Sequence, residues 1–219
     1  MYDFFAYLSA GVVVLAAFLY LGVGGTLPTA WQGTLGFGLG VVVAYSAGHV
    51  VAQLSGFLFE RKLTIGVIGR SEYFLLRQPR PAGWRAALFP GYIDGLPTPT
   101  IESLLARVPK EVAKDATRRA VFLHCWRSVR QSPAIAARLD TFLAQYGYCR
   151  NMAMALLVAA VILMAAGVAD RFRHVAVPSE LWVWLAGALF IAPFMYYRYL
   201  KFYRQYTYEV FTNYSDSPP

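Results

Sequence analysis

Charged side chains are scarce in this chain of 219 residues. Asp, Glu, Lys and Arg make up 15% of it, against about 25% in an average soluble domain. The scarcity is uneven, because no such residue occurs between Asp3 and Glu60. The hydrophobic share is 58%, which excludes a disordered chain, since disorder requires low hydrophobicity. The sequence therefore argues against an ordinary soluble enzyme and predicts an integral membrane protein.

Cysteine and histidine are also scarce, with two cysteines and three histidines. They show no metal-ligand spacing such as Cys-x-x-Cys. We therefore expect no metal site and no cofactor. Cys125 and Cys149 are predicted to face the reducing side of the membrane, where a disulfide is not expected.

Four uncharged stretches are candidates for membrane spans, since a spanning helix needs about 20 mostly apolar residues. A short turn, 25–33, follows the first stretch, and Trp182 and Trp184 open the last like an interfacial aromatic belt. The stretches are 4–24, 34–59, 151–169 and 181–197.

The distribution of basic residues predicts the orientation. Most of the 20 Lys and Arg residues lie between 60 and 150, and others follow the last span at Arg198, Lys201 and Arg204. The positive-inside rule then puts this central segment and both termini in the cytoplasm. We expect a multi-pass protein of the cell's inner (plasma) membrane.

The predicted fold class is an all-α integral membrane protein with four transmembrane helices and a cytoplasmic helical cap between helices 2 and 3. Proline and glycine are dense from 78 to 100, which predicts a loop without regular structure. Thr100 is expected to cap a helix over 101–107. Pro109 is expected to start a helix to about 130, and Pro133 a helix that continues into the third span. The predicted domains are 1–59 (helices 1 and 2), 60–150 (cap), 151–199 (helices 3 and 4) and 200–219 (an amphipathic helical tail).

A polar stripe follows one face of the second predicted helix. Ser46, His49, Gln53 and Glu60 recur at helical spacing. This face could line a pore, a proton path or a ligand site, because polar groups avoid lipid. Alternatively, the stripe forms hydrogen bonds that fix helix packing. Glycines on the same helix predict close backbone approach: Gly33, Gly36, Gly38, Gly40 and Gly48.

A tyrosine seam continues beyond the fourth span, at Tyr196, Tyr199, Tyr203 and Tyr206. Its 3-4 spacing suits either self-association into a homo-oligomer or packing on the chain's own cap. Tyrosine favours both contacts because it buries a large area at low entropic cost.

Arginine dominates the basic residues of the cap. Guanidinium groups suit phosphate, so this set could bind a nucleotide or nucleic acid, or the anionic lipids of the membrane. No phosphate-binding glycine loop accompanies it. The candidate ligand or lipid-binding residues are Arg77, Arg80, Arg85, Arg118, Arg127 and Arg130.

The segment Arg119-Ala-Val-Phe-Leu-His124 resembles the R-x4-H motif of HEPN-type helical ribonucleases. In that family the Arg and His act together on an RNA backbone, so the resemblance implies catalytic roles for Arg119 and His124. The polar residue that usually follows the arginine is Ala120 here. Alternatively, His124 is a buried structural histidine beside Cys125.

The favoured function is a non-enzymatic, oligomeric membrane protein. Its basic cytoplasmic domain would sense a ligand or soluble partner and couple it to the transmembrane bundle, as a pore, effector or sensor. The alternatives are a membrane-tethered HEPN-like ribonuclease and a membrane scaffold that recruits a soluble partner. Membrane lipids are expected partners in every case.

Overall fold

In a computed structural model of the chain, the described residues are 2–23, 33–77, 82–114, 118–172, 174 and 177–216. Every regular element within these ranges is a helix, which confirms the all-α prediction. Three helical segments in the described chain are long and apolar enough to cross a membrane: Thr34–Leu75, Pro133–Phe172 and Ser179–Asp216. The first helix has a shorter apolar stretch, Phe4–Tyr20. The predicted turn at 25–33 lies, apart from Gly33, outside the described residues.

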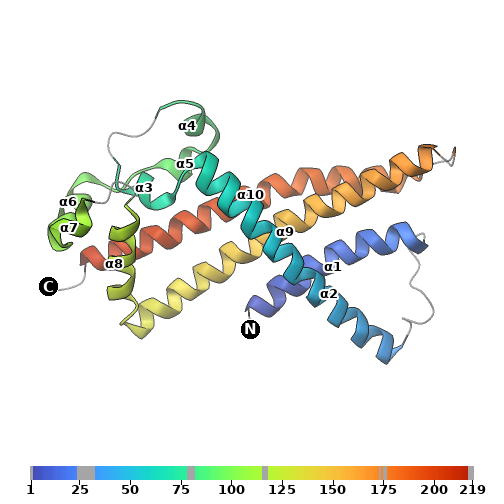
Figure 1. Ribbon diagram of the computed structural model, residues 1–219, viewed down its shortest axis with the longest axis horizontal. Coiled ribbons are helices and arrows are strands. Elements are labelled where there is room, and N and C mark those ends of the chain that lie inside the picture. Colours follow the sequence, from blue (N-terminus) through green and yellow to red (C-terminus); the bar gives the residue numbers. More distant parts are fainter. Residues whose placement is uncertain are drawn as a thin grey trace. The chain divides into compact units, whose positions relative to one another are not determined.

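Figure 1 shows the helices in the colours of the sequence. Two of them, α9 and α10, are much longer than the rest, with 40 and 38 residues. The helices are α1 (Tyr2–Val23), α2 (Thr34–Ser55), the π-helix η2 (Gly56–Ile68), α3 (Ser71–Leu75), α4 (Trp84–Leu88), α5 (Pro90–Ile93), α6 (Thr98–Arg107), α7 (Lys110–Ala113), α8 (Arg119–Val129), α9 (Pro133–Phe172) and α10 (Ser179–Asp216).

The chain divides into two compact units. Unit 1 consists of Met1–Glu60 and Gly147–Tyr199, and unit 2 of Arg61–Tyr146 and Leu200–Pro219. The chain therefore passes from one unit to the other three times. Each passage lies inside a continuous helix, first η2, then α9, then α10.

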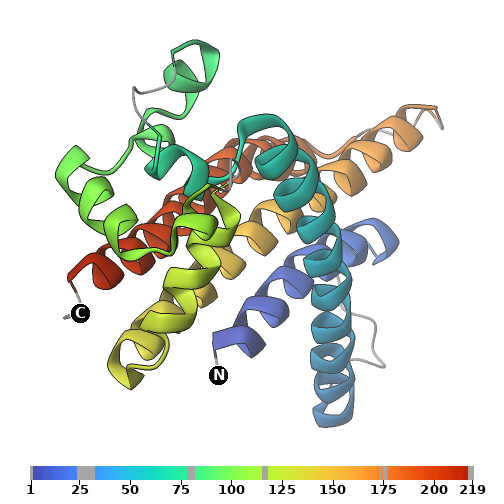
Figure 2. The same cartoon turned by 60° about the vertical axis from the view of Figure 1, so that its left-hand side comes forward.

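Within unit 1, α1 and α2 lie side by side (Figure 2). Glycine makes this possible, because a Cβ atom on Gly11 would overlap the carbonyl of Ala44, and one on Gly48 would overlap the carbonyl of Tyr7. Small residues allow such backbone contact between membrane helices. The predicted packing role is confirmed for Gly48, whereas Gly33 and Gly38 face open space.

The rest of unit 1 is packed mainly through alanine. One buried cluster contains Ala10, Ala153 and Ala155, and a second contains Ala159 and Ala160. Large apolar side chains instead point outward: Leu35 is 88% exposed and Val183 is 70% exposed. This distribution suits lipid, which does not drive large apolar groups inward as water does.

Unit 2 has an interior of the kind found in soluble domains. Its helices are short and two-faced: on α6, Ile101 and Leu104 are buried while Glu102 is exposed. The core draws on α3, α6, α8, the start of α9 and the end of α10. Its buried members include Leu75, Leu104, Val121, Phe122, Cys125, Leu139, Val210 and Phe211.

The prediction of a loop without regular structure over 78–100 is wrong for much of that segment. Helices α4 and α5 lie within it, and α6 begins at Thr98. The prolines do not prevent these helices because Pro90 occupies the first position of α5 and Pro99 lies in the first turn of α6. Proline has no amide hydrogen to lose there, and its fixed φ suits a helix start.

The predicted helix from Pro109 to about 130 is also wrong as a single element. Its first part, α7, ends at Ala113, and α8 begins only at Arg119. Arg118 has a φ of 60°, a left-handed conformation that a helix interior does not accept. By contrast, the predicted continuation of the helix from Pro133 through the apolar stretch 151–169 is confirmed by α9.

Candidate functional site

A set of buried and partly buried polar side chains in unit 1 connects the end of α2 to α9. Ser55 donates a hydrogen bond to Asn151 Oδ1 at 2.7 Å, and both side chains are buried. Arg150 Nε donates to Ser55 Oγ at 3.2 Å, and its Nη1 atom pairs with Glu60. We call these four residues the unit 1 polar network. Polar and ionised side chains within membrane helices are costly and therefore mark sites of function.

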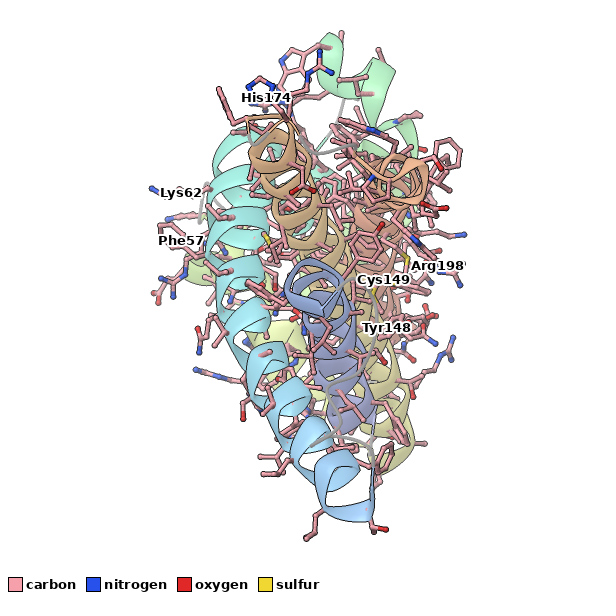
Figure 3. All side chains as sticks on the ribbon, turned by 90° about the vertical axis from the view of Figure 1, so that its right-hand side faces the viewer. Phe57, Lys62, Tyr148, Cys149, His174 and Arg198 are labelled. Carbon is pink, nitrogen blue, oxygen red and sulfur yellow. The ribbon has the colours of Figure 1, made fainter. Side chains whose placement is uncertain are left out.

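Local backbone structure positions this network. Ser55 ends α2, and Gly56 starts the π-helix, with its amide directed at the carbonyls of Ala52 and Gln53. At the other end of η2, Gly69 N–H donates to Thr64 O at 2.7 Å, five residues back. Along η2, Phe57 and Lys62 project outward (Figure 3).

Only one member of the predicted polar stripe joins this network, namely Glu60. Ser46, His49 and Gln53 lie on the exposed side of α2. Ser46 Oγ donates to Val42 O in its own helix at 2.9 Å. The buried face of α2 is a different one, made by Gly36, Ala44, Gly48, Val51 and Ser55.

His49 has aromatic contacts on both sides. Its ring stacks on Tyr7 with a centroid distance of 4.2 Å and meets Tyr45 edge-on at 4.7 Å. These contacts hold the imidazole against α1 while leaving it accessible from outside unit 1. The imidazole ring is thus positioned by packing, and it forms no hydrogen bond with another described residue.

Unit 2 has a polar network of its own, centred on Glu72. The Glu72 carboxylate is almost fully buried and lies 3.3 Å from both Arg70 Nη1 and Arg119 Nη1. Next to it, Ser71 Oγ and Thr207 Oγ1 are 2.7 Å apart and connect α3 to α10. Two guanidinium groups compensate one buried carboxylate, so Glu72 is held in ion pairs and is not presented as a reactive group.

The two residues of the R-x4-H motif have different partners. Arg119 pairs with Glu72 and also lies 5.4 Å from the centre of the Phe122 ring. His124 Nε2 lies 3.2 Å from the hydroxyl of Tyr214, near the end of α10. Within one chain, the structure gives both side chains packing roles, and sequence reasoning missed Glu72 as the partner of Arg119.

The predicted basic set is not one cluster. Arg118 donates to Ala113 O at 2.8 Å, and Arg130 pairs with Asp140 at 2.9 Å. Arg127 is exposed on α8. Arg77 and Arg85 lie over the rings of Tyr73 and Trp84, and Arg80 lies outside the described residues.

The tyrosine seam packs inside the chain. Tyr196 contacts Phe59 and Tyr199 within unit 1. In unit 2, Tyr203 contacts Tyr92 and Tyr146. The Trp126 indole N–H donates to the Tyr206 hydroxyl at 2.7 Å. The contacts of Tyr203 and Tyr206 correspond to packing on the chain's own cap, the second of the two uses expected for the seam, whereas those of Tyr196 and Tyr199 lie within unit 1.

No group of three His, Cys, Asp or Glu in the described ranges is placed to hold a metal ion. Cys125 and Cys149 are both free thiols in buried positions. Burial raises the pKa of the Cys125 thiol to about 12. Cys125 therefore stays protonated near neutral pH, where a reactive cysteine would be a thiolate.

Comparisons with known proteins add no information on function. No family model, curated protein or solved structure matches the chain.

The residues that sequence reasoning missed, Ser55, Glu72 and Asn151, carried a weak signal. Asn151 and Ser55 each stand next to long apolar stretches, where a polar residue needs a partner.

Proposed function

We propose that the chain is a four-span protein of the cell's inner (plasma) membrane, with both termini and unit 2 in the cytoplasm. The three long apolar helices support this proposal, as do the large apolar side chains that unit 1 exposes. In the proposal, α1 is a span in addition to these three: its length of 22 residues reaches across a bilayer core of about 30 Å at 1.5 Å per residue.

We propose further that the protein is a non-enzymatic sensor. Its basic unit 2 receives an anionic ligand or a soluble partner and passes the change to unit 1, as a pore, effector or signalling bundle does. One observation carries this proposal: all three passages between the units lie inside helices. A helix transmits rotation or displacement along its axis, whereas a flexible linker does not.

Contacts on either side of these passages support the same idea. In unit 1, Arg150 of α9 is bonded to Glu60 of η2. In unit 2, Tyr146 of α9 packs against Tyr203 of α10, with ring centroids 5.9 Å apart. Helices joined by such noncovalent contacts move together rather than singly, which favours a two-state response.

Self-association is the second part of the proposal. The exposed side of α2 carries His49 and Gln53, and neither side chain has a hydrogen-bond partner among the described residues. A homo-oligomer would cover them, since polar side chains form hydrogen bonds between membrane helices. Native mass spectrometry of the detergent-purified protein tests this part. A monomer at all protein concentrations would contradict it and favour a monomeric scaffold.

The coupling is tested at Gly147, where α9 enters unit 1. A Cβ atom there meets no other atom within 4 Å, so Gly147→Ala should leave both units folded. Gly147→Pro should interrupt the helix, because proline removes a backbone hydrogen bond.

Hydrogen exchange of α2 is then measured in proteoliposomes with and without inorganic tripolyphosphate, ATP or a short RNA. We expect one of these probes to change exchange in α2 for the wild type and Gly147→Ala, and not for Gly147→Pro. A bound probe that alters exchange only in unit 2 would contradict coupling. Failure of all three probes to bind would remove the anionic-ligand form of the proposal.

A further inference from the structure

The short helix α4 is unusual within unit 2 because none of its residues is buried. It nevertheless carries two large apolar side chains, Trp84 at 51% exposure and Leu88 at 62%. They are four residues apart and therefore lie on one face of the helix. Figure 1 shows α4 at an edge of unit 2, away from α8 and from the C-terminal end of α10.

Two arginines in this part of the sequence are not used in ion pairs. The Arg85 guanidinium lies 5.5 Å from the centre of the Trp84 ring, and Arg77 lies 5.2 Å from that of Tyr73. Neither forms a salt bridge with a described carboxylate. Both therefore keep their positive charge available, unlike Arg130, which pairs with Asp140.

One environment in particular suits this combination of an amphipathic aromatic ring, an adjacent aliphatic side chain and a guanidinium group that forms no ion pair. Tryptophan prefers the headgroup level of a bilayer, and arginine is attracted to anionic phospholipids. If unit 1 lies in a membrane, a surface of this kind is always close to unit 2, because the units are parts of one chain. Because of this proximity, binding of this face to the bilayer is favoured over binding to a soluble partner.

We propose that α4 is a peripheral membrane anchor that docks on anionic phospholipids. Trp84 and Leu88 enter the boundary between headgroups and acyl chains, and Arg85 binds lipid phosphate. The inference rests on the proposed membrane location of unit 1. It assigns the lipid-binding role to one of the predicted arginines, Arg85, and removes it from Arg118 and Arg130, whose guanidinium groups bind protein atoms.

The test uses nitroxide labels on the full-length protein in liposomes of phosphatidylcholine with or without phosphatidylglycerol. Labels are attached to Leu88→Cys, to Ser103→Cys on an exposed face of α6, and to Leu189→Cys on an exposed face of α10 in unit 1. The native thiols of Cys125 and Cys149 are buried and do not compete for the label. Relaxation by oxygen reports lipid, and relaxation by a water-soluble nickel chelate reports solvent.

We expect the label at 88 to be lipid-protected with phosphatidylglycerol and water-exposed without it, while the label at 103 is water-exposed in both. Arg85→Ala should lower the docked population about fivefold, because one basic residue near an anionic surface changes the membrane-binding equilibrium by about that factor. Trp84→Ala, in otherwise unlabelled protein, should reduce quenching of tryptophan fluorescence by brominated lipids. These two substitutions test the anchor without relying on the Leu88 variant alone.

A label at 88 that is equally accessible to nickel in both kinds of liposome would overturn the anchor. A label already immobilised in detergent would also overturn it, since protein rather than lipid would then cover α4. The label at 189 separates the two proposals. If it is water-exposed, the membrane location of unit 1 fails; if it is lipid-protected and 88 is not, the anchor alone fails.

Discussion

Alanine predominates among the buried apolar side chains of unit 1, whereas larger apolar side chains predominate in unit 2. Unit 1 buries alanines such as Ala10 and Ala153 and exposes large residues such as Leu35. Unit 2 buries Leu104 and Phe211 and exposes polar residues. The contrast follows from the surroundings for which each unit is suited: lipid rewards close backbone packing, whereas water rewards removal of apolar surface. One chain therefore contains two kinds of side-chain packing, and the boundaries between them lie inside continuous helices.

The largest expected effect concerns the glycine contacts that distinguish unit 1. We expect Gly48→Leu to separate α1 from α2, because a side chain there collides with the Tyr7 backbone, which cannot move aside. The loss of stability should be about 3 kcal/mol or more. Limited proteolysis and hydrogen exchange of α1 measure it.

Gly38→Leu is the matched control, because a Cβ atom at Gly38 meets open space. It should leave the α1–α2 pair intact. If both substitutions separate the helices equally, close backbone approach is not what stabilises unit 1.

The next effect concerns the buried carboxylate of unit 2. Glu72→Ala should destabilise unit 2 by about 2–4 kcal/mol, because it leaves two guanidinium groups facing a site without negative charge. This expected loss of stability is smaller than that for a fully buried ion pair, since both arginines are partly exposed. Near-ultraviolet circular dichroism during thermal unfolding reports the change.

The comparison for Glu72 is Asp140, whose pair with Arg130 lies at the surface. Asp140→Ala should cost about 0–1 kcal/mol. Similar losses for Glu72 and Asp140 variants would show that burial of the Glu72 pair is not what matters.

A third effect depends on pH and is confined to unit 2. Burial raises the pKa of Cys125 from 9.0 to about 12. In that interval the unfolded thiol ionises while the folded thiol stays protonated, so stability falls as the pH rises. At pH 10.5 the loss should be about 2 kcal/mol.

Thermal unfolding at neutral and alkaline pH measures this loss, and Cys125→Val should reduce it. A wild type and a Cys125→Val variant with the same pH dependence would exclude the thiol as its source. Maleimide should label Cys125 only after unit 2 unfolds.

The smallest effect concerns the unit 1 polar network. Asn151→Leu removes the acceptor through which Ser55 bonds to α9 and leaves the Ser55 hydroxyl with Ala52 O in its own helix. Hydrogen bonds between membrane helices contribute about 0.6 kcal/mol, with a maximum near 1.7. Gln53→Leu, on the exposed side of α2, should have no such cost in a single chain. Unfolding in mixed micelles compares the two variants; a larger loss for Gln53→Leu would indicate that an oligomer buries that side.

Much of the helical structure could be predicted from the sequence. The start of α9 at Pro133 and its continuation through 151–169 follow from one helix-start signal and an uninterrupted apolar stretch. The break before Arg119 could not be predicted, because a left-handed residue other than glycine has no strong local signal. Helices α4 and α5 were missed because dense proline and glycine mark turns more often than helix starts.

The candidate sites were predicted less well than the helices. Glu60 was expected among its neighbours on one helical face, yet its partner Arg150 lies 90 positions later in the chain. Glu72 was not expected at all, since its neighbour Arg119 is 47 positions away. Such pairs depend on which faces of distant helices meet, and helical spacing describes only one helix at a time.

The order of amino acids alone determines that this chain is helical and rich in lipid-compatible segments, because both properties arise from composition and short-range periodicity. Only the tertiary structure decides that Gly48 meets a backbone while Gly38 meets nothing. It also decides that Arg119 is bound to Glu72 and that Arg85 keeps its charge available. The physical reason is the same in each case: the environment of a side chain depends on residues that are distant in sequence and close in space.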